Sequence, residues 1–366
     1  MGDIMSKIRI TEKSSYGPIR FEARYSFLQE MFNVAKKKII NKEQDCYQFV
    51  GNWIDKNING DNLELILNID IFTRFLASGR IIYELDKILF EALSITELDI
   101  PCSTLNLPYS TFYIQLGEYS SLFDGVYVDK YISSEDVNGE EDTIWFYFVY
   151  KNYAKNKTSL SQLRRDKICG DKLRSCELDI SEPNSIIKDI LQNEITSSFY
   201  IQYSIAERNG TLNNENTQLH LQKEKLESEE ILKLFPLVVN LILYINSQNN
   251  DVIEDWNKDT PIEKTLRLEK GNNVNERKNL EKGLLEAGYS KVLYVGKNFA
   301  KTKEANLLAK ALTTGKILST HFRRGHFRNQ PYGKNNLLRK VVFIAPTIVN
   351  EGGEMLGKII KLQDKG

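Results

Sequence analysis

This chain has few cysteines and no net charge. It has four cysteines in 366 residues, too few for a disulfide scaffold, so we expect a cytoplasmic protein in a reducing compartment. Cys169 and Cys176 lack the spacing and the further ligands of a zinc site. The 49 Lys and Arg residues balance 49 Asp and Glu residues. This balance excludes a protein that binds nucleic acid through its overall charge, but it allows a local basic patch.

Long hydrophobic runs are absent as well. The longest, residues 231–245, has about 15 residues and contains Lys233, Pro236 and Asn240, which makes it too short and too interrupted for a membrane span. It predicts a buried core helix, and no membrane partner is expected. Residues 1–13 contain no apolar segment of the kind found in signal peptides.

Several motifs with known chemistry are also missing. The chain has no Gly-x4-Gly-Lys phosphate loop, no Gly-x-Gly-x-x-Gly fingerprint and no His-Glu-x-x-His motif, so no cofactor and no metal site is predicted. Gly296-Lys297 follows an expected strand but lacks the upstream glycine of a phosphate loop. Histidine-based catalysis would need His220, His321 or His326. His220 lies in a polar stretch and is expected to be simply exposed.

Hydrophobic periodicity predicts helices first and strands afterwards. Apolar residues recur at helical spacing in residues 27–56, 65–76 and 81–92. Runs rich in Tyr, Phe, Val and Ile, typical of strands, follow at residues 110–116, 125–132 and 143–150, and a further strand is expected at residues 173–180. The acidic segment 135–142 is expected to be a solvated hairpin tip.

The second half of the chain mixes both periodicities. Helices are predicted at residues 181–192, 229–247, 276–287 and 303–312, and strands at 291–295, 316–328 and 337–346. Polar residues 209–227 predict an exposed excursion, and residues 248–275 a linker or mobile loop. This order indicates an α+β fold, with an N-terminal helical region packed on a mixed or antiparallel sheet. The predicted parts are a helical region 1–97, an α+β region 98–350 that ends in a basic β-hairpin, and a tail 351–366.

The positive charge is concentrated near the C-terminus. Residues 301–345 contain ten Lys and Arg residues and a single acid, Glu304. Alternation along a strand would place Arg324, His326 and Arg328 on one face, where they would form a grip for phosphate or carboxylate groups. The predicted RNA- or anion-binding residues are His321, Arg323, Arg324, His326, Arg328, Tyr332, Arg339 and Lys340.

Other interpretations of this segment stay open. The arginines would pair with carboxylates from the acidic remainder of the chain if the hairpin were purely structural. His321 and His326 would form an acid–base pair for RNA cleavage if a bulge at Gly325 brought them to one face. Metal binding is disfavoured because the segment contains no Asp, Glu or Cys.

The same residues carry a family resemblance. The pattern His321-x-Arg323-Arg324-Gly325-His326-aromatic, followed by a basic strand ending in Ile344-Ala345-Pro346, resembles the C-terminal signature of a type V-A anti-CRISPR family of phages and mobile elements. Three weaker stretches resemble it in the same order: Leu105-Asn106-Leu107-Pro108 leading into Phe112-Tyr113-Ile114; Asp124-Gly125-Val126; and Leu234-Phe235-Pro236-Leu237. Phe327 departs from the pattern, where Trp is expected.

The resemblance implies a recognition protein. It implies binding to the N-terminal peptide of a nascent target, such as the type V-A CRISPR nuclease, and loss of the target mRNA. The implied partners are that nascent polypeptide, the ribosome and mRNA, and a recruited host nuclease. A groove beside residues 105–150, with Leu107 and Tyr113, would take the peptide by strand addition. The alternatives are a metal-independent endoribonuclease with His326 and His321 as catalytic residues, and a single-strand RNA-binding protein. An enzyme is the less favoured of these, because other acid–base groups are lacking near the motif.

Overall fold

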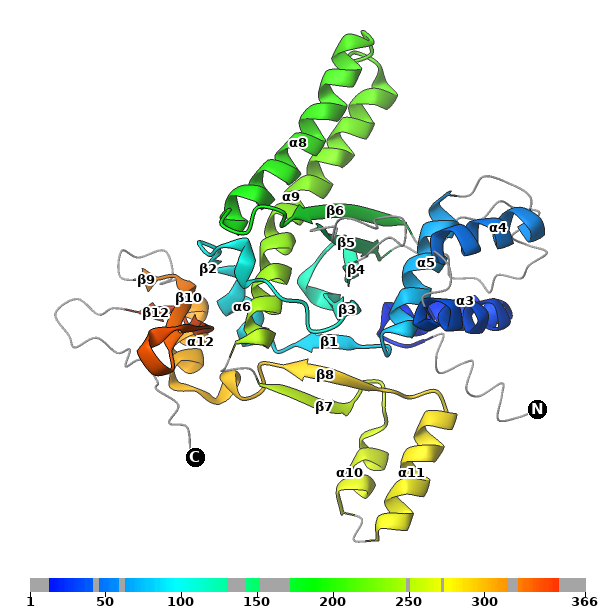
Figure 1. Cartoon of the computed structure of the whole chain (residues 1–366), viewed down its shortest axis with the longest axis vertical. Helices are drawn as coiled ribbons and strands as arrows, with labels where there is room; N and C mark the ends of the chain where they lie inside the picture. Colours follow the sequence, from blue (N-terminus) through cyan, green and yellow to red (C-terminus); the bar gives the residue numbers. More distant parts are fainter. Residues whose placement is uncertain are drawn as a thin grey trace, which may run out of the picture. The chain divides into compact units, whose positions relative to one another are not determined.

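The structure is a computed structural model of the chain (Figure 1). It describes residues 13–41, 46–58, 63–130, 143–151, 172–247, 251–270, 273–314 and 322–348. Helices and strands both contribute substantially, so the predicted α+β class is confirmed. None of the helices in these ranges has the length and hydropathy of a membrane span.

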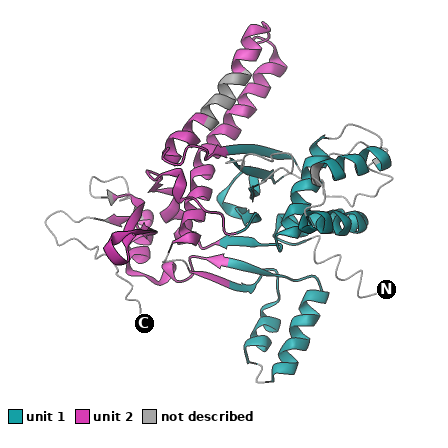
Figure 2. Cartoon of the chain, in the orientation of Figure 1, with its two compact units in different colours: residues 1–84, 109–177, 254–293 teal, residues 85–108, 178–253, 294–366 magenta. Residues whose placement is uncertain are grey.

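The chain divides into two compact units (Figure 2). Unit 1 comprises residues 1–84, 109–177 and 254–293, and unit 2 comprises residues 85–108, 178–253 and 294–366. Each unit therefore combines segments that are distant in the sequence. The division predicted at residues 97 and 350 remains a prediction.

Four helices lead into the sheet of unit 1: α2 (Gly17–Arg24), α3 (Gln29–Asn41), α4 (Cys46–Ile58) and α5 (Leu63–Ala77). The predicted helical periodicity is confirmed at 65–76, and 27–56 is divided between α3 and α4. Aromatic rings join these helices to the sheet, since Phe72 of α5 lies 4.8 Å from Phe21 and Phe75 lies 5.7 Å from Tyr127. The N-terminal helices therefore share their core with the strands.

The largest sheet has seven strands in the order β6-β5-β4-β3-β1-β8-β7. They are β1 (Ile82–Leu85), β3 (Thr111–Gln115), β4 (Phe123–Asp129), β5 (Thr143–Tyr150), β6 (Leu173–Asp179), β7 (Val252–Trp256) and β8 (Lys291–Val295). Strand β3 pairs antiparallel with β4 and parallel with β1, and β4 pairs antiparallel with β5. The strands predicted near 110, 125, 143, 173 and 291 are confirmed. The hairpin tip predicted at 135–142 lies outside the described residues.

Three predictions of local structure are wrong. Residues 81–92 are not one helix, because Ile82–Leu85 pair with β3 and the Asp86 side chain then caps helix α6 (Lys87–Ser94) by accepting a hydrogen bond of 2.9 Å from the Ile88 N–H. The linker expected at 248–275 contains β7 and α10 (Ile262–Lys270), followed by α11 (Val274–Glu286). The excursion at 209–227 lies mostly in helix α9 (Glu215–Asn246), whose exposed half supplies little hydrophobic signal.

A buried polar cluster in unit 1 joins α2 to the sheet. Asp124 of β4 accepts hydrogen bonds from the Arg20 guanidinium at 2.7 Å and from the Tyr113 hydroxyl at 2.9 Å. Two glycines leave room for it: a Cβ at Gly17 or Gly125 would come within 2.6 or 2.2 Å of the Tyr113 hydroxyl. We refer to Arg20, Asp124 and Tyr113 as the Asp124 cluster.

A second buried carboxylate gives the stability of unit 1 a dependence on pH. Asp129 accepts a hydrogen bond of 2.5 Å from Thr111 and lies 3.3 Å from Arg74. Burial raises its pKa to about 6, although Arg74 and Thr111 act in the opposite direction. Between about pH 4, where this carboxyl ionises in the unfolded chain, and pH 6, the folded protein holds a proton that the unfolded chain has lost.

The free energy of unfolding is therefore expected to fall as pH rises from about 4 to about 6 and to level off above that, relative to an Asp129→Asn variant that cannot ionise. Urea unfolding of both proteins at several pH values between 4.5 and 7.5 measures this difference. A difference that stays constant over that range would contradict the raised pKa.

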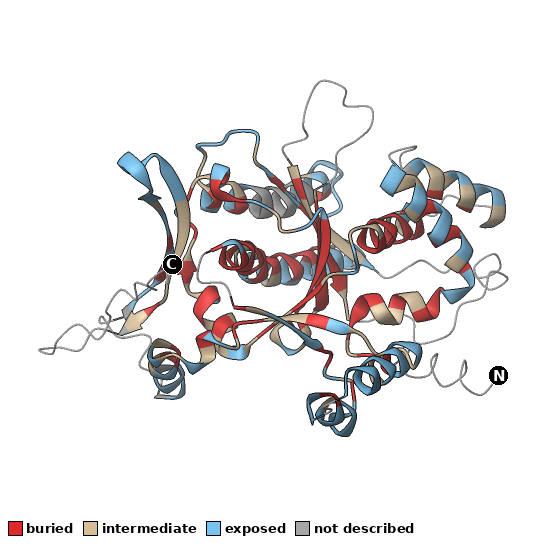
Figure 3. Ribbon diagram, turned by 60° about the horizontal axis from the view of Figure 1, so that its bottom comes forward, coloured by how far each residue is buried: buried red, intermediate tan, exposed pale blue. Residues whose placement is uncertain are grey.

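Unit 2 is built around the second half of α9. Residues 234–245 of this helix are buried except for the half-buried Pro236, and buried residues are drawn in red in Figure 3. The core helix predicted at 229–247 is thus confirmed as part of a longer helix. It packs against α6 and α8 (Ile187–Arg208), and the buried Asn240 amide donates to the carbonyls of Leu93 and Thr96 at 2.9 and 3.0 Å. Those bonds hold the chain where it enters β2 (Thr96–Glu97).

The C-terminal part of unit 2 contains helix α12 (Lys303–Thr314) and four strands. They are β9 (Phe322–Arg323), β10 (Gly325–Tyr332), β11 (Leu338–Ile344) and β12 (Thr347–Ile348). Strands β11, β10 and β2 form a three-stranded sheet, and β12 pairs with β9. The basic β-hairpin expected from the sequence is therefore β10–β11.

Candidate functional site

The β10–β11 hairpin has one anchored face. Phe327 and Phe343 lie opposite each other in the antiparallel register, with ring centroids 5.2 Å apart, and both are buried. Phe343 also packs against Tyr244 of α9 at 5.2 Å. Phe327 thus lies in an apolar core, where a phenylalanine needs no hydrogen-bond partner. Position 327, where the family pattern has Trp and this chain has Phe, therefore lies on the packed face of the hairpin.

The opposite face of the hairpin carries polar side chains. His326, Arg328, Gln330 and Tyr332 alternate along β10 with the buried side, and all but the half-buried Gln330 are exposed. Lys340 lies across from Gln330, so it shares their face. We call His326, Arg328, Gln330, Tyr332 and Lys340 the outer face of the hairpin. Residues 325–348 contain no Asp or Glu, so this face has a positive local charge.

Contacts within the outer face orient its side chains. The Arg328 guanidinium donates to the Gln330 side-chain oxygen at 2.8 Å. The Lys340 ammonium lies 5.3 Å from the centre of the Tyr332 ring. A guanidinium, an ammonium and an imidazole next to an exposed aromatic ring suit a ligand with phosphates and flat bases.

Glu97 places one carboxylate beside this face. It is the parallel neighbour of His326, and it accepts a hydrogen bond of 3.1 Å from Arg324. Both side chains are substantially exposed, so the pair contributes little to stability. The Glu97 carboxylate nevertheless offsets the charge of Arg324. We therefore expect His326, Arg328 and Lys340, rather than Arg324, to bind an anion. Glu97 is 227 positions from Arg324, and no local pattern in the sequence pointed to it.

Gly325 is required by the close approach of β2. A Cβ at this position would come within 2.4 Å of the Thr96 hydroxyl and 3.2 Å of the Ile344 carbonyl oxygen. The pairing of β10 with β11 runs from His326 to Tyr332 without a shift. The glycine between Arg324 and His326 therefore serves strand packing.

Replacing Gly325 with alanine is expected to lower the free energy of unfolding by about 1 to 3 kcal/mol, because the new methyl group must displace β2 or β11. Thermal unfolding measures this loss. Gly210→Ala is no suitable control because of its positive φ, whereas Gly283→Ala adds a methyl group in open space within α11. An unfolding temperature equal to that of the native protein would contradict the close approach.

The remaining predicted residues of this segment lie off the outer face. Arg323 is exposed on β9, and Arg339 is exposed near the tip on the side opposite Lys340. His321 lies outside the described residues, so the proposed pairing of His321 with His326 stays a prediction.

The backbone amides of the loop after β8 are already hydrogen-bonded within the protein. The buried carboxylate of Asp251 accepts hydrogen bonds from the N–H groups of Gly296 and Phe299. The Lys297 ammonium lies 3.9 Å from the centre of the Tyr294 ring. A phosphate would have to displace Asp251 from these amides, which agrees with the missing glycine of a phosphate loop.

Comparison with protein families identifies the chain. The AcrVA2-like model, which describes the anti-CRISPR type V subtype A2 family, matches residues 83–351, well over half of the sequence. The chain belongs to the AcrVA2-like anti-CRISPR family. The resemblance inferred from the His-x-Arg-Arg-Gly-His-aromatic pattern is thereby confirmed.

Solved structures add a weaker likeness. A crystal structure of AcrVA2 aligns with 96% of this chain and 100% of its own, at 13% sequence identity and a TM-score of 0.44. A search of curated proteins finds no match.

The two residues predicted for peptide binding in this AcrVA2-like chain occupy different environments. Tyr113 has no exposed surface and belongs to the Asp124 cluster, so its side chain offers nothing to a peptide at the surface. Strand β3 pairs on both sides, with β1 and β4, so no strand can be added there. Leu107 is half-buried in the loop before β3. Among the described strands of this sheet, only β6 and β7 lie at an edge.

Most of the N-terminal helices precede the residues that match the AcrVA2-like family, yet they are integrated into unit 1. Asp259 accepts hydrogen bonds from the hydroxyl groups of Ser14 and Ser15 at 2.8 and 2.6 Å. Arg20 reaches Asp124 within the matched range. The N-terminal helices are therefore packed together with those matched residues that belong to unit 1.

Proposed function

We propose that this protein blocks production of its target by binding the N-terminal peptide of the nascent target chain and promoting loss of its mRNA. The target we favour is the type V-A CRISPR nuclease, because the chain belongs to the AcrVA2-like anti-CRISPR family. Its partners are the nascent polypeptide, the ribosome with its mRNA, and a host nuclease that cuts the message.

The outer face of the hairpin is the observation that supports the RNA side of this proposal. Arg328, Lys340 and His326 lie with Tyr332 on one side of a hairpin whose other side is anchored by Phe327 and Phe343. Phosphate contacts by Arg and Lys supply affinity, while an exposed aromatic ring stacks on an unpaired base. The face therefore suits the single-stranded parts of a message.

Recoding the target gene separates peptide recognition from RNA recognition. Synonymous codons for the first 30 or so residues change the message and keep the peptide, so mRNA loss is expected to persist. A compensated frameshift over the same codons keeps nearly all nucleotides and changes the peptide, so mRNA loss is expected to stop. If mRNA loss follows the nucleotides instead, the nascent-peptide proposal is wrong.

An endoribonuclease is the alternative, and the position of Glu97 next to His326 favours it. An imidazole and a carboxylate on neighbouring strands are the groups that general acid–base cleavage of RNA uses. Cleavage of a labelled RNA by the pure protein in EDTA, abolished by His326→Ala, would establish this alternative. An intact RNA after prolonged incubation would leave cleavage to a recruited nuclease.

A further inference from the structure

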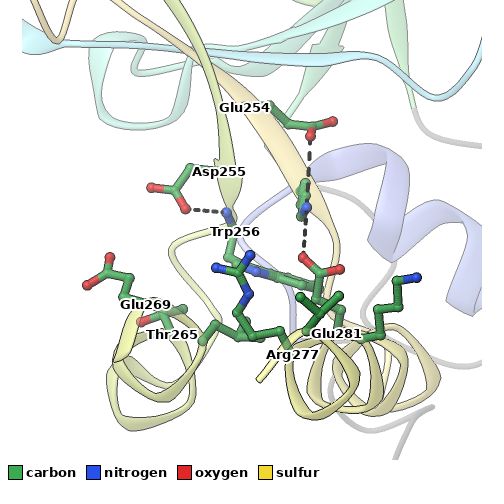
Figure 4. A pocket seen from close by; sticks show the side chains of 11 residues that line it. Glu254, Asp255, Trp256, Thr265, Glu269, Arg277 and Glu281 are labelled. Carbon is green, nitrogen blue, oxygen red and sulfur yellow. Dashed lines mark hydrogen bonds and ion pairs between the residues drawn. The ribbon is translucent and has the colours of Figure 1, made fainter. Parts of the chain in front are cut away.

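A cavity of about 430 Å³ lies in unit 1 between β7, α10 and α11 (Figure 4). Part of its lining, from Glu254 to Val274, comes from the residues for which the sequence predicted a linker. Its floor is apolar, since Trp256 and Leu268 belong to a small core cluster with Leu284. Because these side chains are packed from behind, the floor keeps its shape without a ligand. We call this cavity the β7–α11 trough.

Two sides of the β7–α11 trough carry acids. Glu254 and Asp255 project from β7, and Glu269 comes from α10 (Figure 4). Lys291 lies 3.3 Å from Glu281 and 3.9 Å from Glu254, so its charge is already balanced. No ion pair joins Glu269 to another residue in the described part of the chain.

The third side carries the opposite charge. Arg277 and Lys278 line the trough from α11, where Glu281 is already paired with Lys291, and Figure 4 shows Arg277 facing the side that holds Glu269. A ligand that lies across the trough therefore meets carboxylates toward α10 and β7 and cations toward α11. This polarity suits a chain segment whose basic side chain and backbone carbonyl groups point in opposite directions.

Exposed apolar side chains occur on both helices that form the trough. Val274 lines the trough and is 59% exposed, while Ile262 is 74% and Leu266 is 42% exposed on α10. Three large apolar residues on two short helices exceed what a purely solvated helical hairpin requires. Val274 extends the apolar floor of the trough outward, and Ile262 and Leu266 add exposed apolar surface to α10.

We propose that the β7–α11 trough binds an extended segment of the target peptide in which an apolar residue stands beside a basic one. The apolar side chain lies on Trp256 and Val274, the basic group reaches Glu269 and Asp255, and Arg277 meets the peptide carbonyls. This inference rests on the proposed function, which requires a peptide-binding site, and it moves that site away from Tyr113.

Fluorescence anisotropy with the full-length protein tests the proposal. The probe is a labelled peptide of the first 20 residues of a type V-A CRISPR nuclease. Glu269→Lys is expected to weaken its binding at least tenfold, and Val274→Ser several-fold. The matched controls are Glu263→Lys on α10 and Leu285→Ser on α11, which are exposed and do not line the trough. Both are expected to bind within twofold of the native protein.

Exchanging the charges of the probe and of Glu269 tests their contact directly. A probe in which the basic residue is replaced by glutamate is expected to bind poorly to the native protein and to regain affinity for the Glu269→Lys variant. Circular dichroism of the variants checks that each is folded, as expected for changes at exposed positions.

Two outcomes would overturn the trough as the peptide site. If the probe binds equally to native protein, Glu269→Lys and Val274→Ser, the peptide binds elsewhere and the proposed function stands. If the native protein binds no probe at all and mRNA loss follows nucleotides in the recoding experiment, the proposed function fails together with the trough.

Discussion

Replacing Gly125 with alanine is expected to destabilise unit 1 by about 3 to 5 kcal/mol, enough to leave much of the protein unfolded at 37 °C. The new Cβ would lie 2.2 Å from the Tyr113 hydroxyl oxygen and 2.5 Å from the Ile114 carbonyl oxygen. The second contact is with backbone of the neighbouring strand, so a rotamer change of Tyr113 cannot relieve it. Any shift of Tyr113 also breaks its hydrogen bond to Asp124.

The Asp124 cluster makes this change more costly than ordinary overpacking. Asp124 is buried and is held by Arg20 and Tyr113. Loss of one partner leaves buried charge with fewer hydrogen bonds, and that costs several kcal/mol in comparable sites. Asp124→Asn is expected to be destabilising for the same reason, since a neutral amide leaves the Arg20 charge without its counterion.

Urea unfolding followed by circular dichroism measures both effects. Gly283→Ala is the matched control, because a Cβ there meets nothing within 4 Å and alanine favours the interior of helix α11. It is expected to leave stability unchanged or to raise it by up to about 1 kcal/mol. An unfolding midpoint for Gly125→Ala equal to that of Gly283→Ala would refute the close packing of β3 on β4.

Reversing the charge of Arg328 and Lys340 together is expected to produce the largest loss of RNA affinity. Each phosphate contact with a single strand contributes about 0.7 to the slope of log affinity against log salt. Removing two contacts should therefore lower that slope by about 1.4 and weaken binding about tenfold or more near physiological salt. Both side chains lie on the outer face of the hairpin, so the fold should tolerate the change.

The control carries the same change in net charge elsewhere. Lys225→Glu with Lys282→Glu places two acids at exposed positions of α9 and α11. Binding of a labelled single-stranded RNA, measured from about 0.05 to 0.3 M salt, compares the two double variants. Equal slopes for both would show that affinity depends on total charge and would remove the hairpin from the RNA side of the proposal.

Sequence patterns predicted the elements whose burial follows their periodicity. Strand β5 was predicted with its observed ends because bulky apolar residues fill it between two polar loops. Strand β1 was mistaken for a helix because a strand of four residues, three of them buried, is too short to show alternation, and Ile81, Leu85 and Ile88 happen to match helical spacing. Helix α10 was missed because only Leu268 among its residues is buried.

The candidate site was only partly accessible to sequence reasoning. Alternation along β10 correctly separated His326 and Arg328 from the buried Phe327. The partners that modify these residues come from far away in the chain, as Glu97 does for Arg324. Tyr113 was assigned to a peptide because its strand resembles the family pattern, whereas long-range pairing with Asp124 and Arg20 buries it. Such contacts leave no trace in local spacing.

The interleaving of the two units sets a limit on when this protein can fold during its own synthesis. Unit 1 needs residues 254–293 in addition to residues 1–84, so its last strand leaves the ribosome long after its helices. At about 5 to 20 residues per second, that delay is roughly 10 to 40 s. Unit 2 is incomplete until the hairpin has also been made. Helices α2 to α5 can already pack on one another and on β3 and β4 by then, but the sheet keeps an open edge at β1 until β8 and β7 have been made. Chaperones that hold nascent chains are therefore expected to protect that edge.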